Sequence, residues 1–174
     1  MTKTYRSHPI QIGHLTMGGD APVCIQSMTN TDTNDIAASV EQCVRMINKG
    51  AQLVRLTTQG KREVNSLAAI RNLLLDKGLK TPVVADIHFK PDLALDAARE
   101  VEKIRINPGN YLKGNSVDEL LPRLIMVCKK HGTAMRIGVN HGSLNDSILN
   151  RFGDTPEGMV ESAMQFLRVC QKSP

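Results

Sequence analysis

The sequence predicts an α/β chain that forms part of a (β/α)8 TIM barrel, with about five of the eight βα units present. Short apolar segments alternate five times with amphipathic segments of helical length, which implies a parallel sheet with right-handed crossovers. Polar residues stand at the ends of nearly all these segments, as in a barrel that gathers its active site from the carboxyl ends of several strands. A doubly wound sheet would favour a glycine-rich turn after its first strand, and Met28-Thr29-Asn30-Thr31 has no glycine.

Five strands are expected at the apolar segments, which are bounded by polar or turn-forming residues. They span residues 22–29, 53–57, 82–88, 103–107 and 135–140. Ahead of them, residues 5–19 combine alternating apolar and polar residues with paired glycines, which predicts a small N-terminal hairpin that would plug the bottom of the barrel. A complete barrel takes about 250 residues, so five units make up only part of one.

The expected helices show apolar residues at helical spacing together with capping signals. The first helix follows the Thr33-Asn34 capping signal and ends before Gly50. A capping box opens at Ser116, although Pro122 means that this helix either starts later or kinks. The helices are expected at residues 36–47, 64–74 and 91–98, after Ser116, and at residues 156–170.

Composition predicts one globular domain covering residues 1–174, because 41% of the residues are hydrophobic. The net charge is +5, but the chain has no Trp and only five Tyr and Phe, and single-strand nucleic-acid binders need aromatic stacking platforms. No apolar segment is long enough to span a bilayer, and no signal peptide follows Met1. We therefore expect no nucleic-acid or membrane partner, a small anionic substrate, and a cytoplasmic location, or an organelle stroma if a transit peptide has been removed.

The four cysteines, Cys24, Cys43, Cys128 and Cys170, lie far apart in the sequence. None forms a Cys-x-x-Cys pair, so they match neither a zinc site nor an iron–sulfur ligand set. Three of them fall on the apolar faces of expected helices. We therefore expect reduced core thiols and no iron, zinc or disulfide in this segment.

Three of the expected strands carry a central arginine, namely Arg55, Arg105 and Arg136. Residues i, i+2 and i+4 of a strand share a face, so Arg55/Thr57, Arg105/Asn107 and Arg136/Gly138/Asn140 would each project to one side. Unpaired charge among buried strands is unfavourable by several kcal/mol, on the order of the penalty for an unmatched buried ion, so these residues should meet an anion. A phosphate or diphosphate site is predicted; the alternative is three arginines on edge strands that point into solvent.

Further polar candidates lie at the same strand ends. Asp86 and His88 have the i, i+2 relation, and we favour direct substrate contact over a metal because the arginines already supply positive charge. Asn107 opens an Asn-Pro-Gly sequence that predicts a tight turn facing the anion. Asn140 precedes a polar loop whose His141 suits a surface role as well as a functional one.

Four segments, at residues 24–31, 84–89, 105–110 and 136–144, closely resemble the hydroxymethylbutenyl diphosphate synthase family of the non-mevalonate isoprenoid pathway. The resemblance runs in order and spacing from about Ile10 to Cys170. Residues 140–144 and 153–163 look like the large, plant-type branch, which carries an inserted domain after its barrel.

The resemblance implies a reductive ring opening, in which 2-C-methyl-D-erythritol 2,4-cyclodiphosphate loses its ring C–O bond and a hydroxyl and takes up two electrons. It implies a [4Fe-4S] cluster on a separate C-terminal domain, reduced ferredoxin or flavodoxin as the electron donor, and a homodimer of the full-length protein. It also implies that the substrate is bound by Arg55, Asp86, His88, Arg105, Asn107, Arg136 and Asn140.

The resemblance covers only part of that family's length. The last three barrel strands, a barrel lysine, and the three cysteines and one glutamate expected to hold the cluster are missing from these residues, so this segment alone is expected to be inactive. Two alternatives stay open: a pterin-type barrel similar to dihydropteroate synthase, and a non-catalytic phosphate-binding fragment.

Overall fold

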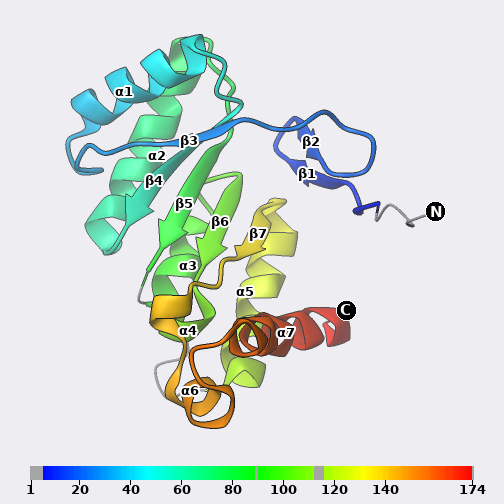
Figure 1. Ribbon diagram of the computed structural model, residues 1–174. Coiled ribbons are helices and arrows are strands. Elements are labelled where there is room, and N and C mark those ends of the chain that lie inside the picture. Colours follow the sequence, from blue (N-terminus) through cyan, green and yellow to red (C-terminus); the bar gives the residue numbers. More distant parts are fainter. Residues whose placement is uncertain (1–5, 89, 112–115, 174) are drawn as a thin grey trace.

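A computed structural model of the chain describes residues 6–88, 90–111 and 116–173. Its centre is a parallel sheet of five strands in the order β3-β4-β5-β6-β7 (Figure 1). These strands are β3 (Gln26–Met28), β4 (Leu53–Thr58), β5 (Val83–Ile87), β6 (Lys103–Ile106) and β7 (Ala134–Ile137). A separate antiparallel hairpin, formed by β1 (Ile10–Ile12) and β2 (Leu15–Met17), precedes them. Tyr5 of the predicted hairpin and Phe89 of the family segments lie outside the described residues.

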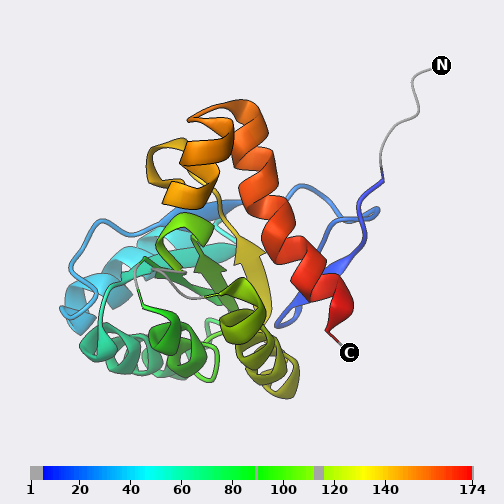
Figure 2. The same cartoon turned by 90° about the horizontal axis from the view of Figure 1, so that it is seen from below.

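A helix connects each strand to the next, which confirms the predicted α/β class. The connecting helices are α1 (Ile36–Asn48), α2 (Lys61–Asp76), α3 (Pro91–Ala97) and α5 (Val117–His131), and α7 (Pro156–Lys172) follows the last strand. Short elements that the sequence pattern did not predict stand in the loops: α4 (Pro108–Tyr111), a 3-10 turn at His141–Ser143, and α6 (Asp146–Phe152). Helices α1, α2, α3 and α5 cover one side of the sheet, α7 packs against α5, and the hairpin lies on the other side of the sheet (Figures 1 and 2).

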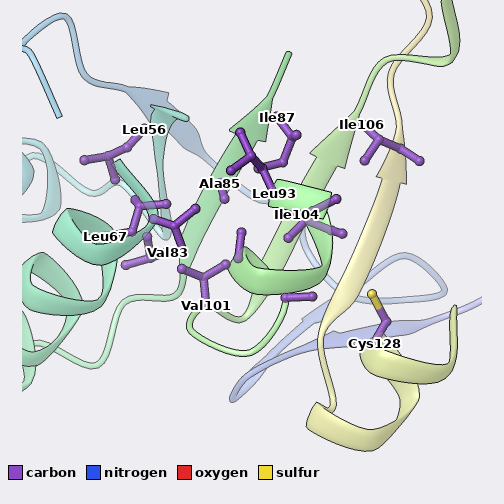
Figure 3. Close-up of a cluster of buried hydrophobic side chains, with 14 of the residues drawn as sticks. Leu56, Leu67, Val83, Ala85, Ile87, Leu93, Val101, Ile104, Ile106 and Cys128 are labelled. Carbon is purple, nitrogen blue, oxygen red and sulfur yellow. The ribbon is translucent and has the colours of Figure 1, made fainter. Parts of the chain in front are cut away.

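The main hydrophobic core lies between the sheet and the helices (Figure 3). Alternate residues of the strands point into it, because successive side chains of a strand face opposite sides. Helical residues such as Leu67 and Leu124 meet them there, and both are fully buried. The strand residues in this core are Val54, Leu56, Val83, Ala85, Ile87, Ile104 and Ile106.

The hairpin covers the amino-terminal end of the opposite face of the sheet, which is the inner face of a barrel. Ile12 keeps only 1% of its surface exposed and packs with Leu53 and Val84, near the starts of β4 and β5. Burying such a side chain contributes roughly 1.5–3 kcal/mol. The predicted position of the hairpin at the bottom of the barrel is confirmed.

Two predicted helix starts can be compared with their observed caps. The N-cap of α1 is Asp35, whose carboxylate accepts the Ala38 backbone N–H at 3.1 Å, so the Thr33-Asn34 assignment was wrong by one residue. Ser116 caps α5 as predicted, with its hydroxyl accepting the Asp118 N–H at 3.2 Å. This helix starts directly after its cap and continues through Pro122.

The first and fifth strands are shorter than the residue patterns predicted. Gln26 pairs with Leu53, the first residue of β4, so residues 22–25 have no strand to join. At the other edge Ile137 pairs with Ile106, the last residue of β6, and β7 ends there. Strand length is thus set by the neighbouring strand. Among the described residues, no helix combines the length and apolar character needed to cross a membrane.

Candidate functional site

Three predicted site residues, Asp86, Arg105 and Arg136, form part of one row across the inner face. The register aligns Thr57 with Asp86, Asp86 with Arg105, and Arg105 with Arg136. Arg55 lies two residues before Thr57 and therefore on the same face. The prediction that the three arginines share a face is confirmed.

The Asp86 carboxylate joins three of the predicted residues. Its Oδ2 accepts hydrogen bonds from Arg55 Nη2 at 2.5 Å and lies 3.0 Å from His88 Nε2. Its Oδ1 accepts a hydrogen bond from Arg105 Nη1 at 3.1 Å. Asp86 is 1% exposed, and the side chains of Arg55 and Arg105 are 20% and 12% exposed. We call Arg55, Asp86, His88 and Arg105 the Asp86 cluster.

The charge of Asp86 is stabilised by its neighbours. Burial by itself would raise the pKa of this carboxyl, but the hydrogen bond with His88, the hydrogen bond and charge of Arg55, and the charge of Arg105 bring the pKa below its usual value. Asp86 is therefore ionised at neutral pH. Two guanidinium groups share one carboxylate, so the cluster keeps a net positive charge.

The sequence pattern did not reveal that the arginines already have a buried carboxylate partner. A strand pattern gives the face of a side chain but not the neighbour that it contacts. The pairing with Asp86 fixes the two guanidinium groups before a ligand arrives, while the Nε of Arg55 is buried without a hydrogen-bond partner among the described residues.

Arg105 is held from a second side by the backbone of the next strand. Its Nη2 donates to the carbonyl of Gly138 at 2.6 Å. A Cβ atom at position 138 would lie 2.2 Å from Arg105 Nε, so glycine is required for this arrangement. The sequence pattern placed Gly138 on the face of Arg136. In the structure it leaves room for the Arg105 side chain and accepts its hydrogen bond.

Arg136 is not part of the Asp86 cluster. It is exposed and forms no ion pair with any described residue. With Lys103 and Gln26 it lines a cavity of about 340 Å³ whose remaining wall includes Ile12 and Met17 of the hairpin. Two of the three arginines therefore meet at one carboxylate, and the third lies beside them.

Lys103 is a buried cation that the sequence pattern did not single out, although it shares parity with Arg105. It keeps 7% of its surface exposed, and its ammonium group forms no hydrogen bond or ion pair within the described part of the chain. Burial and then the charge of Arg136 lower its pKa; Cys24 opposes this, and Arg55 adds a smaller lowering effect.

Asn107 and Asn140 belong to two loops that are in contact. Asn107 Nδ2 donates to Ser143 Oγ at 2.8 Å, and Asn107 Oδ1 accepts the Gly109 N–H at 3.2 Å. Asn107 also accepts backbone N–H groups of the following helical turn, so the predicted tight turn is instead the start of α4. Asn140 is exposed, and its carbonyl accepts from the backbone N–H and hydroxyl of Ser143 at 3.1 and 3.2 Å.

The described residues do not suit a metal cluster. No group of three His, Cys, Asp or Glu side chains among them is arranged to hold a metal ion. Burial raises the pKa of Cys43 and of Cys128 to about 11, with a smaller contribution from Cys170 at Cys128. Both thiols are therefore protonated at neutral pH, whereas a cluster requires thiolates.

Parallel strands with helices outside, a hairpin beneath the inner face, and charged residues toward the strand ends define a barrel domain of the (β/α) class. Residues 7–174 match the family model described as the GcpE TIM-barrel domain. The chain belongs to this family, and the predicted TIM-barrel fold class is confirmed.

The comparisons also give named relatives. A 4-hydroxy-3-methylbut-2-en-1-yl diphosphate synthase (flavodoxin) of Parabacteroides distasonis is 49% identical over 96% of this chain and 30% of its own length. The chloroplastic ferredoxin-type synthase of Oryza sativa subsp. japonica is 40% identical over 98% of this chain and 25% of its own length. The chain thus spans less than a third of these relatives.

A solved structure of a dihydropteroate synthase from Xanthomonas albilineans covers 95% of this chain and 89% of its own, with 13% identity and a TM-score of 0.45. The family match supports the resemblance to the diphosphate synthases and not the pterin-type alternative.

Proposed function

We propose that this chain is the N-terminal, substrate-binding part of a 4-hydroxy-3-methylbut-2-enyl diphosphate synthase. Such an oxidoreductase converts 2-C-methyl-D-erythritol 2,4-cyclodiphosphate to 4-hydroxy-3-methylbut-2-enyl diphosphate in isoprenoid biosynthesis. A ring C–O bond breaks, a hydroxyl leaves as water, and two electrons and two protons are taken up. Membership of the GcpE family and the names of the relatives support this proposal.

The observation that carries the binding role is the Asp86 cluster. Arg55 and Arg105 are fixed by one buried carboxylate and keep an excess positive charge. Charge-assisted hydrogen bonds from fixed guanidinium groups suit the oxygens of a diphosphate. Arg136, Asn107 and Asn140 complete the proposed binding residues around this cluster.

The electron-transfer part of the reaction is assigned to residues beyond this chain. The four cysteines do not fit a [4Fe-4S] cluster, since at least Cys43 and Cys128 are buried thiols in the hydrophobic core. We therefore place the cluster on a further domain of the full-length protein, which we propose to be a cytoplasmic homodimer. The names of the relatives support flavodoxin or ferredoxin as the electron donor.

The test is calorimetric titration of the full-length protein with the cyclic diphosphate. Arg136→Met is the cleanest variant, because Arg136 has no ion pair within the described residues whose loss would disturb the fold. We expect this variant and Arg55→Met each to weaken binding by about 1.5–3 kcal/mol, the scale of charge-assisted hydrogen bonds. Arg45→Met is the matched control, because the ion pair of Arg45 among the described residues is with Glu41, on the exposed side of α1.

Unchanged affinity in both variants would contradict the proposed binding role. Binding of a pterin diphosphate in place of the cyclic diphosphate would support the dihydropteroate synthase-like alternative. Binding of inorganic diphosphate without turnover in the reduced full-length protein would support a non-catalytic phosphate-binding module.

A further inference from the structure

Ser143 provides a hydrogen bond that joins the side chain of Asn107 to the loop that carries Asn140. Its hydroxyl accepts the Asn107 amide N–H at 2.8 Å and donates to the Asn140 carbonyl at 3.2 Å. Its backbone N–H donates to the same carbonyl at 3.1 Å. One hydroxyl therefore links the ends of two neighbouring strands.

The two loops also touch through their backbones. A Cβ atom at Gly109 would lie 1.4 Å from the carbonyl oxygen of Ser143, so only glycine permits this approach. Leu144, the next residue, is 7% exposed and anchors the loop in the protein interior. The position of Ser143 is thus set by packing as well as by hydrogen bonds.

The hydrogen bonds around Asn107 leave a defined part of its amide for a ligand. Asn107 is 5% exposed, its Oδ1 accepts from Gly109, and one of its two Nδ2 hydrogens goes to Ser143. The second Nδ2 hydrogen has its direction fixed by the first, because the amide group is planar. Ser143 therefore orients the donor that Asn107 can present.

We propose that Ser143 is a positioning residue that sets both Asn107 and Asn140 for the diphosphate, through its hydroxyl. This inference rests on the proposed function. Ser143 acts through its neighbours, since its hydroxyl is already occupied by the two loop contacts. Loss of the hydroxyl removes one of the two hydrogen bonds that fix the Asn107 amide and one of the two hydrogen bonds on the Asn140 carbonyl.

The experiment compares Ser143→Ala with wild type in the full-length protein, using calorimetric titration with 2-C-methyl-D-erythritol 2,4-cyclodiphosphate. We expect affinity to fall about tenfold, the effect of one lost hydrogen bond of ordinary strength. Ser143→Thr keeps the hydroxyl and should restore most of the affinity. Ser173→Ala is the matched control, because it removes a hydroxyl bonded to the Val169 carbonyl at the far end of α7.

A double-mutant cycle separates positioning from general loosening of the fold. If Ser143 acts through Asn107, Ser143→Ala should weaken binding less when Asn107 has already been replaced by alanine. The loss of affinity between Asn107→Ala and the double variant should then be smaller than the loss that Ser143→Ala causes in wild type. Thermal unfolding of each variant, measured without ligand, shows whether a loss of affinity accompanies a loss of stability.

The outcomes are distinct. Wild-type affinity in Ser143→Ala, or fully additive effects in the cycle with no rescue by threonine, overturns the inference and leaves the proposed function standing. A wild-type protein that fails to bind the cyclic diphosphate overturns the proposed function itself.

Discussion

Replacing Asp86 with asparagine removes the charge at the centre of the site while keeping the shape of the side chain. In wild type its Oδ2 accepts a hydrogen bond from Arg55 Nη2 at 2.5 Å, and its Oδ1 accepts one from Arg105 Nη1 at 3.1 Å. The Nε2 of His88 lies 3.0 Å from Oδ2. The asparagine amide would turn a donor toward one of these groups. Arg55 and Arg105 would then be left as two close cations without a counterion.

The magnitude follows from the burial of the three groups. Removing one partner of a buried ion pair is unfavourable by about 3–5 kcal/mol. Here the side chains of Arg55 and Arg105 remain 20% and 12% exposed, so solvent screens part of the charge. We expect the unfolding free energy of Asp86→Asn to fall by about 3 kcal/mol, the lower end of that range.

Anion binding should change in the opposite direction. A bound diphosphate replaces the missing negative charge, so its stabilising effect should be larger in Asp86→Asn than in wild type. The assay is urea unfolding of the full-length protein with and without a fixed concentration of inorganic diphosphate. Asp96→Asn is the control, because it removes only the exposed ion pair with Arg99.

Two results would refute this reasoning. An Asp86→Asn protein as stable as Asp96→Asn would mean that the buried carboxylate does not hold the arginines in place. An equal diphosphate effect in Asp86→Asn and wild type would mean that the ligand does not reach Arg55 and Arg105.

Three further predictions concern pH, Lys103 and the sheet edges. The folded-state pKa of Asp86 is below its usual 3.8, so the ionised carboxylate stabilises the fold above pH 3.8. This stabilisation is lost as the pH falls through the folded-state pKa, and acid unfolding curves should show the loss in wild type and not in Asp86→Asn. The folded-state pKa of Lys103 is below 10.5, so its charge destabilises the fold at neutral pH and less as the pH approaches 10.5. Lys103→Met should therefore raise the unfolding free energy of this 174-residue chain by about 1 kcal/mol in urea unfolding at pH 7, and this gain should shrink toward pH 10.5. Val23 and Ile25 are 91% and 57% exposed beside the edge strand β3, so this chain should self-associate in size-exclusion chromatography. Ile25→Lys should reduce the association, whereas Val160→Lys on α7 should not. A monomer at high concentration would contradict the prediction.

Much of the fold could be predicted because strands and long helices leave periodic patterns in the sequence. The alternation in β4 placed Arg55 and Thr57 on one face and Val54 and Leu56 on the other, as observed. The helix α4 was missed because four residues are too few to show helical periodicity. The helix α6 is as long as α3 but lacks the proline that marks the start of α3. Their signals are only local, such as Asn145 as the N-cap of α6.

The candidate site was predictable as a set of residues but not as a set of contacts. Parity placed Arg105 and Asp86 on the face that they occupy. Their pairing depends on the register between β5 and β6, which is set by the packing of the helix between them and leaves no pattern in either strand. Ser143 was missed for the same reason, because its partner Asn107 lies 36 residues earlier in the chain.

The inner face changes from apolar to charged within one step along β4 and along β5. In β4 the step is from Leu53 to Arg55, and in β5 it is from Val84 to Asp86. The hairpin packs on the apolar residues and so supports the strands directly below the charged ones. The backbones of these strands are fixed by the hairpin, and the Asp86 carboxylate lies between the two guanidinium groups. Arg55 and Arg105 therefore lose little side-chain conformational freedom when they bind an anion. In β6 the lower position is Lys103 instead of an apolar residue, beside the cavity that the hairpin does not fill. Arg55 and Asp86 therefore follow apolar residues that pack against the hairpin, whereas Arg105 follows a cation and is held in place by Asp86 and the Gly138 carbonyl instead.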